Sequence, residues 1–173
     1  MAVLNNPFVD YPNDVFVETG SHLGDGVQKA LDAGFKKVIS IELADKYFLH
    51  CRNRFLYNSN VEIIQGDSFK VLPSILEKLD CAATFWLDGH HSGYDTGLGE
   101  HWTPLMQELQ AIADHHIKTH TILIDDMRCW EKPNPVHGFY KQDILDFVPK
   151  INPEYTISYI DGIQPEDVMV LKV

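Results

Sequence analysis

The chain has 173 residues, of which 45% are hydrophobic and 23% are charged. This length and balance predict a single globular domain, residues 1–173, and exclude a disordered or low-complexity chain. No apolar run approaches the roughly 18 residues that a membrane span needs, so we expect no membrane-embedded segment and no membrane partner.

The balance of charge narrows the choice of partner. The 25 acidic and 14 basic residues give a formal net charge of −11. A surface this negative repels phosphate backbones, so we do not expect a nucleic acid partner. The first fourteen residues lack the basic and apolar regions of a signal peptide. The odd number and wide spacing of the cysteines argue against a disulfide framework or a zinc knuckle and favour a reducing, cytoplasmic location; they are Cys51, Cys81 and Cys129.

Short β-branched apolar runs alternate with longer segments of helical periodicity. Strands are expected at 15–17, 38–41, 61–64, 84–87 and 122–124, and helices around 27–33, 47–55, 71–79, 105–113 and 139–148. Such alternation predicts an α/β fold, a Rossmann-like doubly wound and mostly parallel sheet with helices on both faces.

The C-terminal part breaks this alternation. Residues 155–160 and 167–173 read as strands, and the turn-rich segment between them has no room for a helix, so this pair should be antiparallel and complete a seven-stranded sheet. Two long loops, Gly89–Gly99 and Lys132–Gly138, each follow a strand. We therefore expect both at the carboxyl edge of the sheet, where open α/β sheets bind ligands.

The first candidate for chemistry is the turn after the first strand, Glu18-Thr19-Gly20-Ser21-His22-Leu23-Gly24. Gly20 permits a tight turn, and Gly24 or Gly26 permits close packing of helix on strand. The spacing is not the dinucleotide motif GxGxxG, so an ordinary strand-to-helix turn remains an alternative.

Acidic residues end the next two expected strands. Glu42 lies 22 residues after Gly20, where an acidic side chain can accept hydrogen bonds from both ribose hydroxyls. Asp67, followed by Ser68, could accept from an adenine amino group. Taken alone, Glu42 could be a solvated carboxylate and Asp67 a helix N-cap. Three successive strand ends of this kind together favour an adenosine-type ligand.

Carboxylates also end the fourth and fifth expected strands, as Asp88 and as Asp125-Asp126. Three carboxylates in one crevice repel each other unless a cation or protons neutralise them. Oxygen ligands in this number suit Mg²⁺. In the alternative interpretation, one of the Asp125-Asp126 pair caps a loop while the other faces water.

Histidines follow the fourth strand directly. His90 or His91 could serve as a general base beside Asp88. They could also be zinc or iron ligands together with Asp88 and Asp125, or simply polar loop residues. Three more histidines near the end of the fourth helix are expected to complement its dipole or to face solvent; they are His115, His116 and His120.

These features, in this order, resemble the class I S-adenosylmethionine-dependent methyltransferases over about Val15–Val173. The resemblance rests on Glu18-Thr19-Gly20 with Gly24, on Glu42, on Gly66-Asp67 and on the closing antiparallel strand pair. It implies S-adenosylmethionine as cofactor, with the glycine turn at the methionine part, Glu42 at the ribose and Asp67 with Ser68 at the adenine. The residues expected to contact the cofactor are Glu18, Thr19, Gly20, Ser21, His22, Gly24, Glu42, Asp67, Ser68 and Asp88.

Two segments, Trp86-Leu87-Asp88 and Ile124-Asp125-Asp126, resemble the divalent-metal O-methyltransferases of the catechol and macrolide-sugar types. That resemblance implies Mg²⁺ held by Asp88, Asp125 and Asp126, and methylation of a hydroxyl on a small-molecule or saccharide acceptor. The catechol type has a lysine base at the position of His91, so His91 or His90 is expected to remove the proton.

Three further expectations concern the acceptor and the alternatives. The loop Met127–Gly138, with Arg128 and Trp130, could close over the acceptor, although Trp130 could equally be packing. The helices that cover the acceptor site in these families have no counterpart before the first strand, which suggests a large acceptor or a homodimer. The rival functions are a metal-dependent hydrolase using Asp88, His90, His91 and Asp125, a non-catalytic binding module with this fold, and, with less support, a nicotinamide dehydrogenase.

Overall fold

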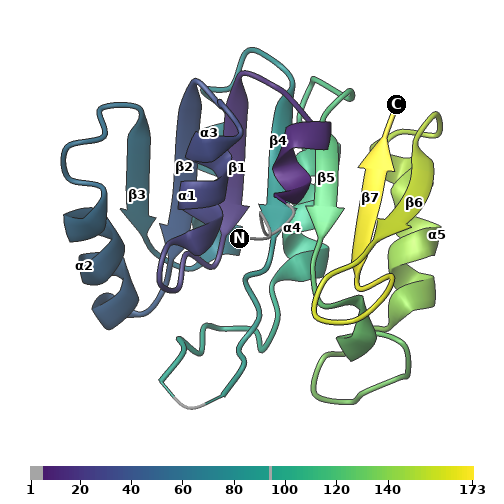
Figure 1. Ribbon diagram of the computed structural model, residues 1–173. Coiled ribbons are helices and arrows are strands. Elements are labelled where there is room, and N and C mark those ends of the chain that lie inside the picture. The colour runs from purple at the N-terminus through teal and green to yellow at the C-terminus, as the bar shows by residue number, and fades with distance from the viewer. Residues whose placement is uncertain (1–5, 94) are drawn as a thin grey trace.

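The computed structural model describes residues 6–93 and 95–173. One seven-stranded sheet organises them (Figure 1). The strands are β1 (Val15–Thr19), β2 (Lys37–Glu42), β3 (Val61–Gln65), β4 (Ala83–Leu87), β5 (Thr121–Ile124), β6 (Thr156–Ile160) and β7 (Val168–Lys172). The helices are α1 (Asp25–Asp32), α2 (Asp45–Arg54), α3 (Ser68–Leu76), α4 (Leu105–Asp114) and α5 (Lys141–Ile151), with short 3₁₀ helices η1 (Pro7–Asp10) and η2 (Met127–Cys129).

The strand order is β3-β2-β1-β4-β5-β7-β6. The first five strands in sequence run parallel, and β7 lies antiparallel between β5 and β6. This confirms the predicted fold class and the closing antiparallel pair. The order reverses beside β1, because the chain moves outward through β2 and β3 and then returns to β4 on the other side. A reversal of this kind opens a crevice at the carboxyl ends of β1 and β4.

Helices cover both faces of the sheet (Figure 1). One face packs against α3, α4 and α5, whose Leu72, Leu109 and Ile144 belong to one buried cluster with strand residues such as Phe85. The other face packs against η1, α1 and α2 through a smaller cluster that includes Phe8, Val27, Phe55 and Leu123. All five residues of β1 are buried, as a strand covered on both faces requires. None of the described helices combines the length and the apolar composition that a membrane crossing demands.

Two of the helix-end histidines correct our expectation. His115 and His120 are buried rather than solvent-facing, and only His116 is exposed. His120 accepts the Ala83 N–H with Nδ1 at 3.1 Å, and its Nε2 lies 2.8 Å from His115 Nδ1. His115 Nε2 in turn lies 3.1 Å from the Leu79 carbonyl. This chain of bonds fixes both rings in the neutral Nε2–H form, because each Nδ1 accepts and each Nε2 donates. Burial and the neighbouring His115 lower the pKa of His120 to about 4.

Candidate functional site

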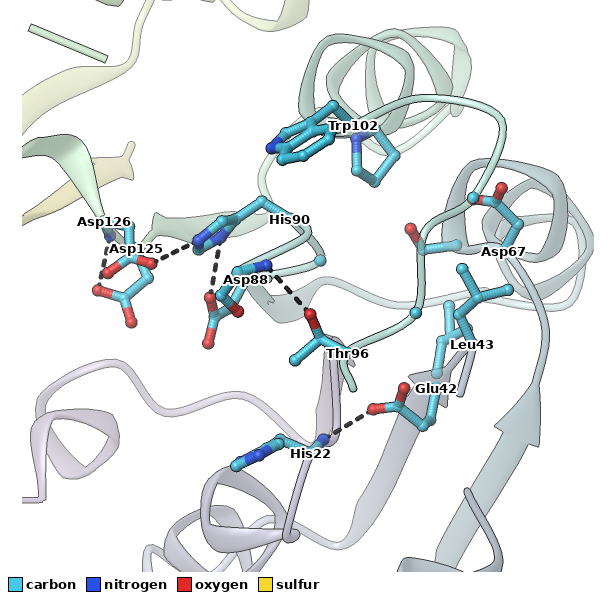
Figure 2. A pocket seen from close by; sticks show the side chains of 18 of the residues that line it. His22, Glu42, Leu43, Asp67, Asp88, His90, Thr96, Trp102, Asp125 and Asp126 are labelled. Atoms are coloured by element: carbon cyan, nitrogen blue, oxygen red, sulfur yellow. Dashed lines mark hydrogen bonds and ion pairs between the residues drawn. The ribbon is translucent and has the colours of Figure 1, made fainter. Parts of the chain in front are cut away.

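A cavity of about 330 Å³ opens at the carboxyl ends of β1 to β5 (Figure 2). Its size is at the lower end of the range typical of ligand pockets. Nine of the residues singled out in the sequence line it: Gly20, His22, Glu42, Asp67, Ser68, Asp88, His90, Asp125 and Asp126. These residues follow or end five different strands. The fold therefore brings together side chains that lie up to about a hundred residues apart in the sequence.

The turn after β1 touches the tip of β4. Gly20 has φ +85°, and a Cβ placed on it would lie 2.4 Å from the Asp88 carbonyl oxygen. The Asp88 N–H points back to Thr19, with both the carbonyl oxygen and Oγ1 of Thr19 at 3.2 Å. Only glycine combines this conformation with this proximity. The turn thus presents bare backbone to the cavity, as close approach by a ligand requires.

Glu42 is a fixed carboxylate on the cavity wall. It is 6% exposed, and its two oxygens accept the backbone N–H groups of His22 and Ala44, both at 2.8 Å. The bond to His22 joins the end of β2 to the turn after β1. Figure 2 shows the carboxylate turned toward His22, with a dashed line marking the bond between them. The remaining lone pairs of the carboxylate can accept further hydrogen bonds from a ligand.

Four residues expected at the cofactor do not line this cavity. Thr19 and Gly24 face packed interior, and a Cβ on Gly24 would meet the Phe55 ring at 2.7 Å. Glu18 and Ser21 instead line a smaller cavity of about 210 Å³ on the other side of the turn, which Gly20, His22, Asp88 and Asp125 also border.

Glu18 supports the turn from beneath. It is 2% exposed, hydrogen-bonds Ser40, and lies 1.7 Å from the position of a Cβ on Gly26. Burial raises its pKa to about 8, with further contributions from the charges of Asp88 and Glu42. Glu18 is therefore a largely neutral carboxyl near pH 7, buried below the turn.

Asp67 occupies the N-cap position of α3 but makes no side-chain cap bond. Its carboxylate instead accepts the Glu100 N–H at 3.1 Å, and a Cβ on Gly99 would lie 2.3 Å from Oδ2. The N-cap alternative is thus not the role of its side chain. One of its two oxygens accepts a hydrogen bond from the loop that follows β4, and the residue also lines the cavity.

A segment of that loop, residues 95–101, borders the cavity through Thr96, Gly97, Gly99 and His101, and we call it the strap. Asp95 pairs with Lys46 and accepts the Tyr47 hydroxyl at 2.9 Å, and Glu100 pairs with Lys70 at 2.8 Å. A Cβ on Gly97 would lie 2.8 Å from the Leu43 side chain. Because these contacts reach α2 and α3, the strap spans from one wall of the cavity to the other.

His90 lies between two carboxylates at the charged end of the cavity (Figure 2). Its Nδ1 lies 3.5 Å from Asp88 Oδ1, and its Nε2 lies 3.0 Å from Asp126 Oδ2. Burial alone would lower the pKa of His90, but the hydrogen bond and charge of Asp88, with the charges of Asp126 and Asp125, raise it.

His91 points elsewhere. Its Nδ1 lies 3.1 Å from Thr96 Oγ1 and 3.2 Å from the Gly97 carbonyl, and its ring packs edge-on against Trp102. It does not line the cavity. Of the two neighbouring histidines, His90 is therefore the one placed to meet a ligand, and His91 holds the base of the strap.

The carboxylates at this end repel one another. Burial, followed by the charges of Asp88 and Asp126, raises the pKa of Asp125 to about 7. Burial also raises the pKa of Asp88, although His90 opposes the shift. Asp126 is held by His90 on one oxygen and by Arg128, at 2.5 Å, on the other. The Arg128 guanidinium thus compensates the charge of Asp126 directly, whereas Asp125 takes part in neither of these contacts.

The donor chemistry of this end fits a hard divalent cation. Asp88, Asp125 and Asp126 offer oxygen ligands only, on the cavity wall, as Mg²⁺ prefers. The raised pKa values of Asp88 and Asp125 indicate negative charge that a cation would relieve. Within the described part of the chain, two groups of three residues bring their ligand atoms within 4.8 Å of one another, and Asp88 belongs to neither; they are Asp125, Asp126 and Asp167, and His90, Asp126 and Cys129.

Three polar residues at the site escaped the sequence argument as site residues. Asp167, fully buried at the start of β7, accepts the Arg128 N–H at 3.1 Å and pairs with its guanidinium. Glu108, 1% exposed on α4, lies beside the hydroxyls of Ser68 and Thr19, and burial raises its pKa to about 7. Cys129 ends η2 near Asp126. No local pattern marks any of them, because each reaches the site through tertiary packing.

The strand order with an antiparallel β7 is the Rossmann-like fold of class I S-adenosylmethionine-dependent methyltransferases. No protein-family model and no curated protein sequence matches the chain. Solved structures match it in fold.

A protein of Clostridium thermocellum assigned as an rRNA-methylase matches with a TM-score of 0.65 and 14% identity, covering 96% of this chain and 93% of its own. A protein of Klebsiella pneumoniae assigned as an O-methyltransferase matches with a TM-score of 0.63 and 14% identity, covering 99% and 80%. The O-methyltransferase TomG of Streptomyces achromogenes, involved in tomaymycin synthesis and solved with S-adenosylmethionine, matches with a TM-score of 0.60 and 12% identity, covering 95% and 74%. At these identities the likeness concerns the fold.

Proposed function

We propose that this protein is an S-adenosylmethionine-dependent methyltransferase that methylates a hydroxyl group of a small-molecule or saccharide acceptor with the help of a divalent cation. The observation that carries the proposal is the cavity of about 330 Å³ at the reversal point of the sheet. Acidic side chains from β2 and β3 line one end of it, and those that follow β4 and β5 line the other.

The first end suits the cofactor. Glu42 is oriented by two backbone N–H groups and keeps lone pairs for the ribose hydroxyls. Asp67 and Ser68 are placed for the adenine, and the bare backbone at Gly20 permits close approach of the methionine part. Glu18, Thr19, Ser21 and Gly24 act indirectly in this proposal, by shaping the turn. S-adenosylmethionine, when bound, supplies an electrophilic methyl group on a sulfonium.

The second end suits the acceptor. Asp88, Asp125 and Asp126 would hold the divalent cation, which as a Lewis acid lowers the pKa of a coordinated hydroxyl. Trp102, 39% exposed on the cavity wall, offers an aromatic face of the kind that packs against a sugar ring. These residues favour a small polyhydroxylated acceptor over a nucleic acid, in agreement with the net charge of −11.

His90 is the group best placed to take the proton. It lies on the cavity wall between Asp88 and Asp126, which orient its ring and would stabilise its charged form. The transfer forms a carbon–oxygen bond to the acceptor and breaks the carbon–sulfur bond of the cofactor. The hydroxyl proton moves to His90, and S-adenosylhomocysteine is left. Alignment of two bound reactants can contribute up to about 7–11 kcal/mol to such a reaction.

The rival hydrolase receives less support. It needs Asp88, His90, His91 and Asp125 around one ion, but His91 is turned toward Thr96 and Gly97 instead. The non-catalytic alternative predicts the same fold without cofactor affinity, so a binding measurement separates the two.

The first test is isothermal titration calorimetry with S-adenosylhomocysteine, with and without Mg²⁺. Micromolar affinity in both conditions is the expected result, because the cofactor end is formed without the cation. Absence of heat in both conditions would remove the methyltransferase proposal and leave the binding-module alternative. A following assay supplies labelled S-adenosylmethionine and a panel of vicinal diols, phenolic and saccharide, with Mg²⁺ or chelator, and expects label transfer with Mg²⁺ only.

A further inference from the structure

His90, Asp126 and Cys129 approach one another from three elements, and the first two of them line the cavity. His90 follows β4, Asp126 follows β5, and Cys129 ends η2. One nitrogen, one oxygen and one sulfur atom of these side chains lie within 4.8 Å of each other. The proposed function assigns no role to Cys129, and the carboxylate-only set for Mg²⁺ does not include it.

The local backbone produces this grouping. Asp126 adopts φ +60° and begins the 3₁₀ turn of η2, in which the Cys129 N–H bonds the Asp126 carbonyl at 2.7 Å. Because a 3₁₀ turn has three residues per turn, Cys129 lies on the same side of the turn as Asp126. Arg128 pairs with Asp167 and with Oδ1 of Asp126. Oδ2 of Asp126 is thereby left facing His90 Nε2 at 3.0 Å.

Asp88 stands behind His90. Its Oδ1 lies 3.5 Å from Nδ1, the ring nitrogen that faces away from Asp126. A carboxylate behind a histidine is the arrangement that orients imidazole as a metal ligand, since it holds the proton on Nδ1 and leaves Nε2 free to bind. Mixed nitrogen, oxygen and sulfur ligands suit borderline ions such as Zn²⁺ or Co²⁺ and do not suit Mg²⁺.

We propose that His90, Asp126 and Cys129 form a binding site for a borderline divalent transition ion of the Zn²⁺ class, distinct from the carboxylate set of Asp88, Asp125 and Asp126. Three protein ligands leave a fourth position open, and it faces the cavity because His90 and Asp126 line the cavity wall. Binding at this site does not depend on the proposed function.

One consequence does rest on the proposed function. The two ligand sets share Asp126, and His90 is the proposed proton acceptor. An ion of the Zn²⁺ class would therefore withdraw one ligand from the magnesium set and occupy the ring nitrogen that takes the proton. Zinc at this site would act as an inhibitor that competes with magnesium.

The test is spectroscopic and independent of activity. Metal-free protein is titrated with Co²⁺, and the near-ultraviolet charge-transfer absorption that a cobalt–thiolate bond produces is recorded. Wild type should show this band at one ion per chain. Cys129→Ser should lose it, and Cys81→Ser, a matched control at the opposite edge of the sheet, should keep it. His90→Gln should weaken Co²⁺ binding, whereas His91→Gln should not.

Second-sphere support is tested by Asp88→Asn, for which a loss of about 10–100-fold in Co²⁺ affinity is expected. A band that persists in Cys129→Ser, or Co²⁺ bound by wild type without any thiolate band, would overturn the proposal. Circular dichroism and thermal unfolding check that each variant is folded. Calorimetry of the metal-free wild type with S-adenosylhomocysteine separates the two hypotheses, because the wild type can fail one measurement and pass the other.

Competition between the ions is read by electron paramagnetic resonance with Mn²⁺ in place of Mg²⁺. Zn²⁺ should displace Mn²⁺ from wild type, and Cys129→Ser should need more Zn²⁺ for the same displacement. Equal displacement in the two proteins would contradict the shared-ligand arrangement.

Discussion

The Glu42 carboxylate accepts the backbone N–H of His22 at 2.8 Å, and this bond links the end of β2 to the turn after β1. The same side chain accepts the Ala44 N–H, so the carboxylate is fixed before any ligand arrives. One acidic residue thus fixes two walls of the cavity relative to each other. Its removal should weaken cofactor binding.

Glu42→Ala should weaken S-adenosylhomocysteine binding by roughly 10–100-fold, because hydrogen bonds to a charged group contribute about 1.5–3 kcal/mol. Calorimetry measures the change. Glu62→Ala is the control, since Glu62 is an exposed carboxylate on β3 that pairs with Lys37. Equal affinity of Glu42→Ala and wild type would show that the ribose lies elsewhere.

Asp125→Asn should abolish Mg²⁺-dependent turnover and leave cofactor affinity almost unchanged. Asp125 lines the acceptor end, and burial and its neighbours raise its pKa to about 7, so a bound cation would stabilise its charged form. Turnover is followed in the label-transfer assay, and Asp80→Asn, on an exposed position before β4, controls for the loss of one negative charge. Full activity of Asp125→Asn in the presence of chelator would rule out the metal assignment.

Gly20→Ala and Gly34→Ala form a matched pair, since both glycines have φ near +90°. A Cβ on Gly34 meets nothing within 4 Å, so only the left-handed conformation is penalised, by about 1–2 kcal/mol. A Cβ on Gly20 would also collide with the Asp88 carbonyl. Urea denaturation should therefore show a larger loss for Gly20→Ala, together with loss of cofactor affinity. Equal losses in the two variants would mean that the turn and the β4 tip are not in contact.

Stability should fall as the pH drops from about 6.5 toward 4. The folded pKa of His120 is lowered to about 4, so the folded state favours the neutral ring. Its stabilising contribution is complete above the unfolded pKa, near 6.5, and is lost as acid protonates the unfolded chain first. At about 1.4 kcal/mol for each pKa unit, the loss reaches up to roughly 3 kcal/mol.

Denaturant titrations at pH 7.5 and pH 5 measure this dependence. His120→Gln should flatten the pH profile between these values, and His50→Gln, an exposed histidine on α2, should retain the wild-type profile. A wild-type profile in His120→Gln would assign the acid sensitivity to another group.

The fold could be predicted because its signals are local. Each strand is a short β-branched run, and each helix carries a period set by neighbours three and four residues apart. The positions of Asp88 and Asp125 also followed from local reasoning, since parallel strands end at one edge. The choice between His90 and His91 did not, because neighbouring loop residues differ in direction according to the path of the loop.

The environment of the other residues could not be predicted, because it depends on contacts between distant parts of the chain. Asp167 looks like an ordinary residue before a strand, yet it is buried against Arg128 from η2. His115 and His120 occupy positions typical of a helix end and a loop, and only their mutual hydrogen bond and the packing of β4 make them interior residues. These contacts depend on which helices and strands meet in the fold. The local sequence around each residue does not show this.

The contact between Gly20 and Asp88 has a consequence for altering the acceptor. The cofactor turn and the β4 tip meet backbone to backbone, so a change of loop path after Asp88 displaces the methyl donor together with the new acceptor. Libraries that seek a new acceptor while preserving the cofactor geometry should therefore hold the β4 tip constant and vary cavity residues away from it, such as Trp102.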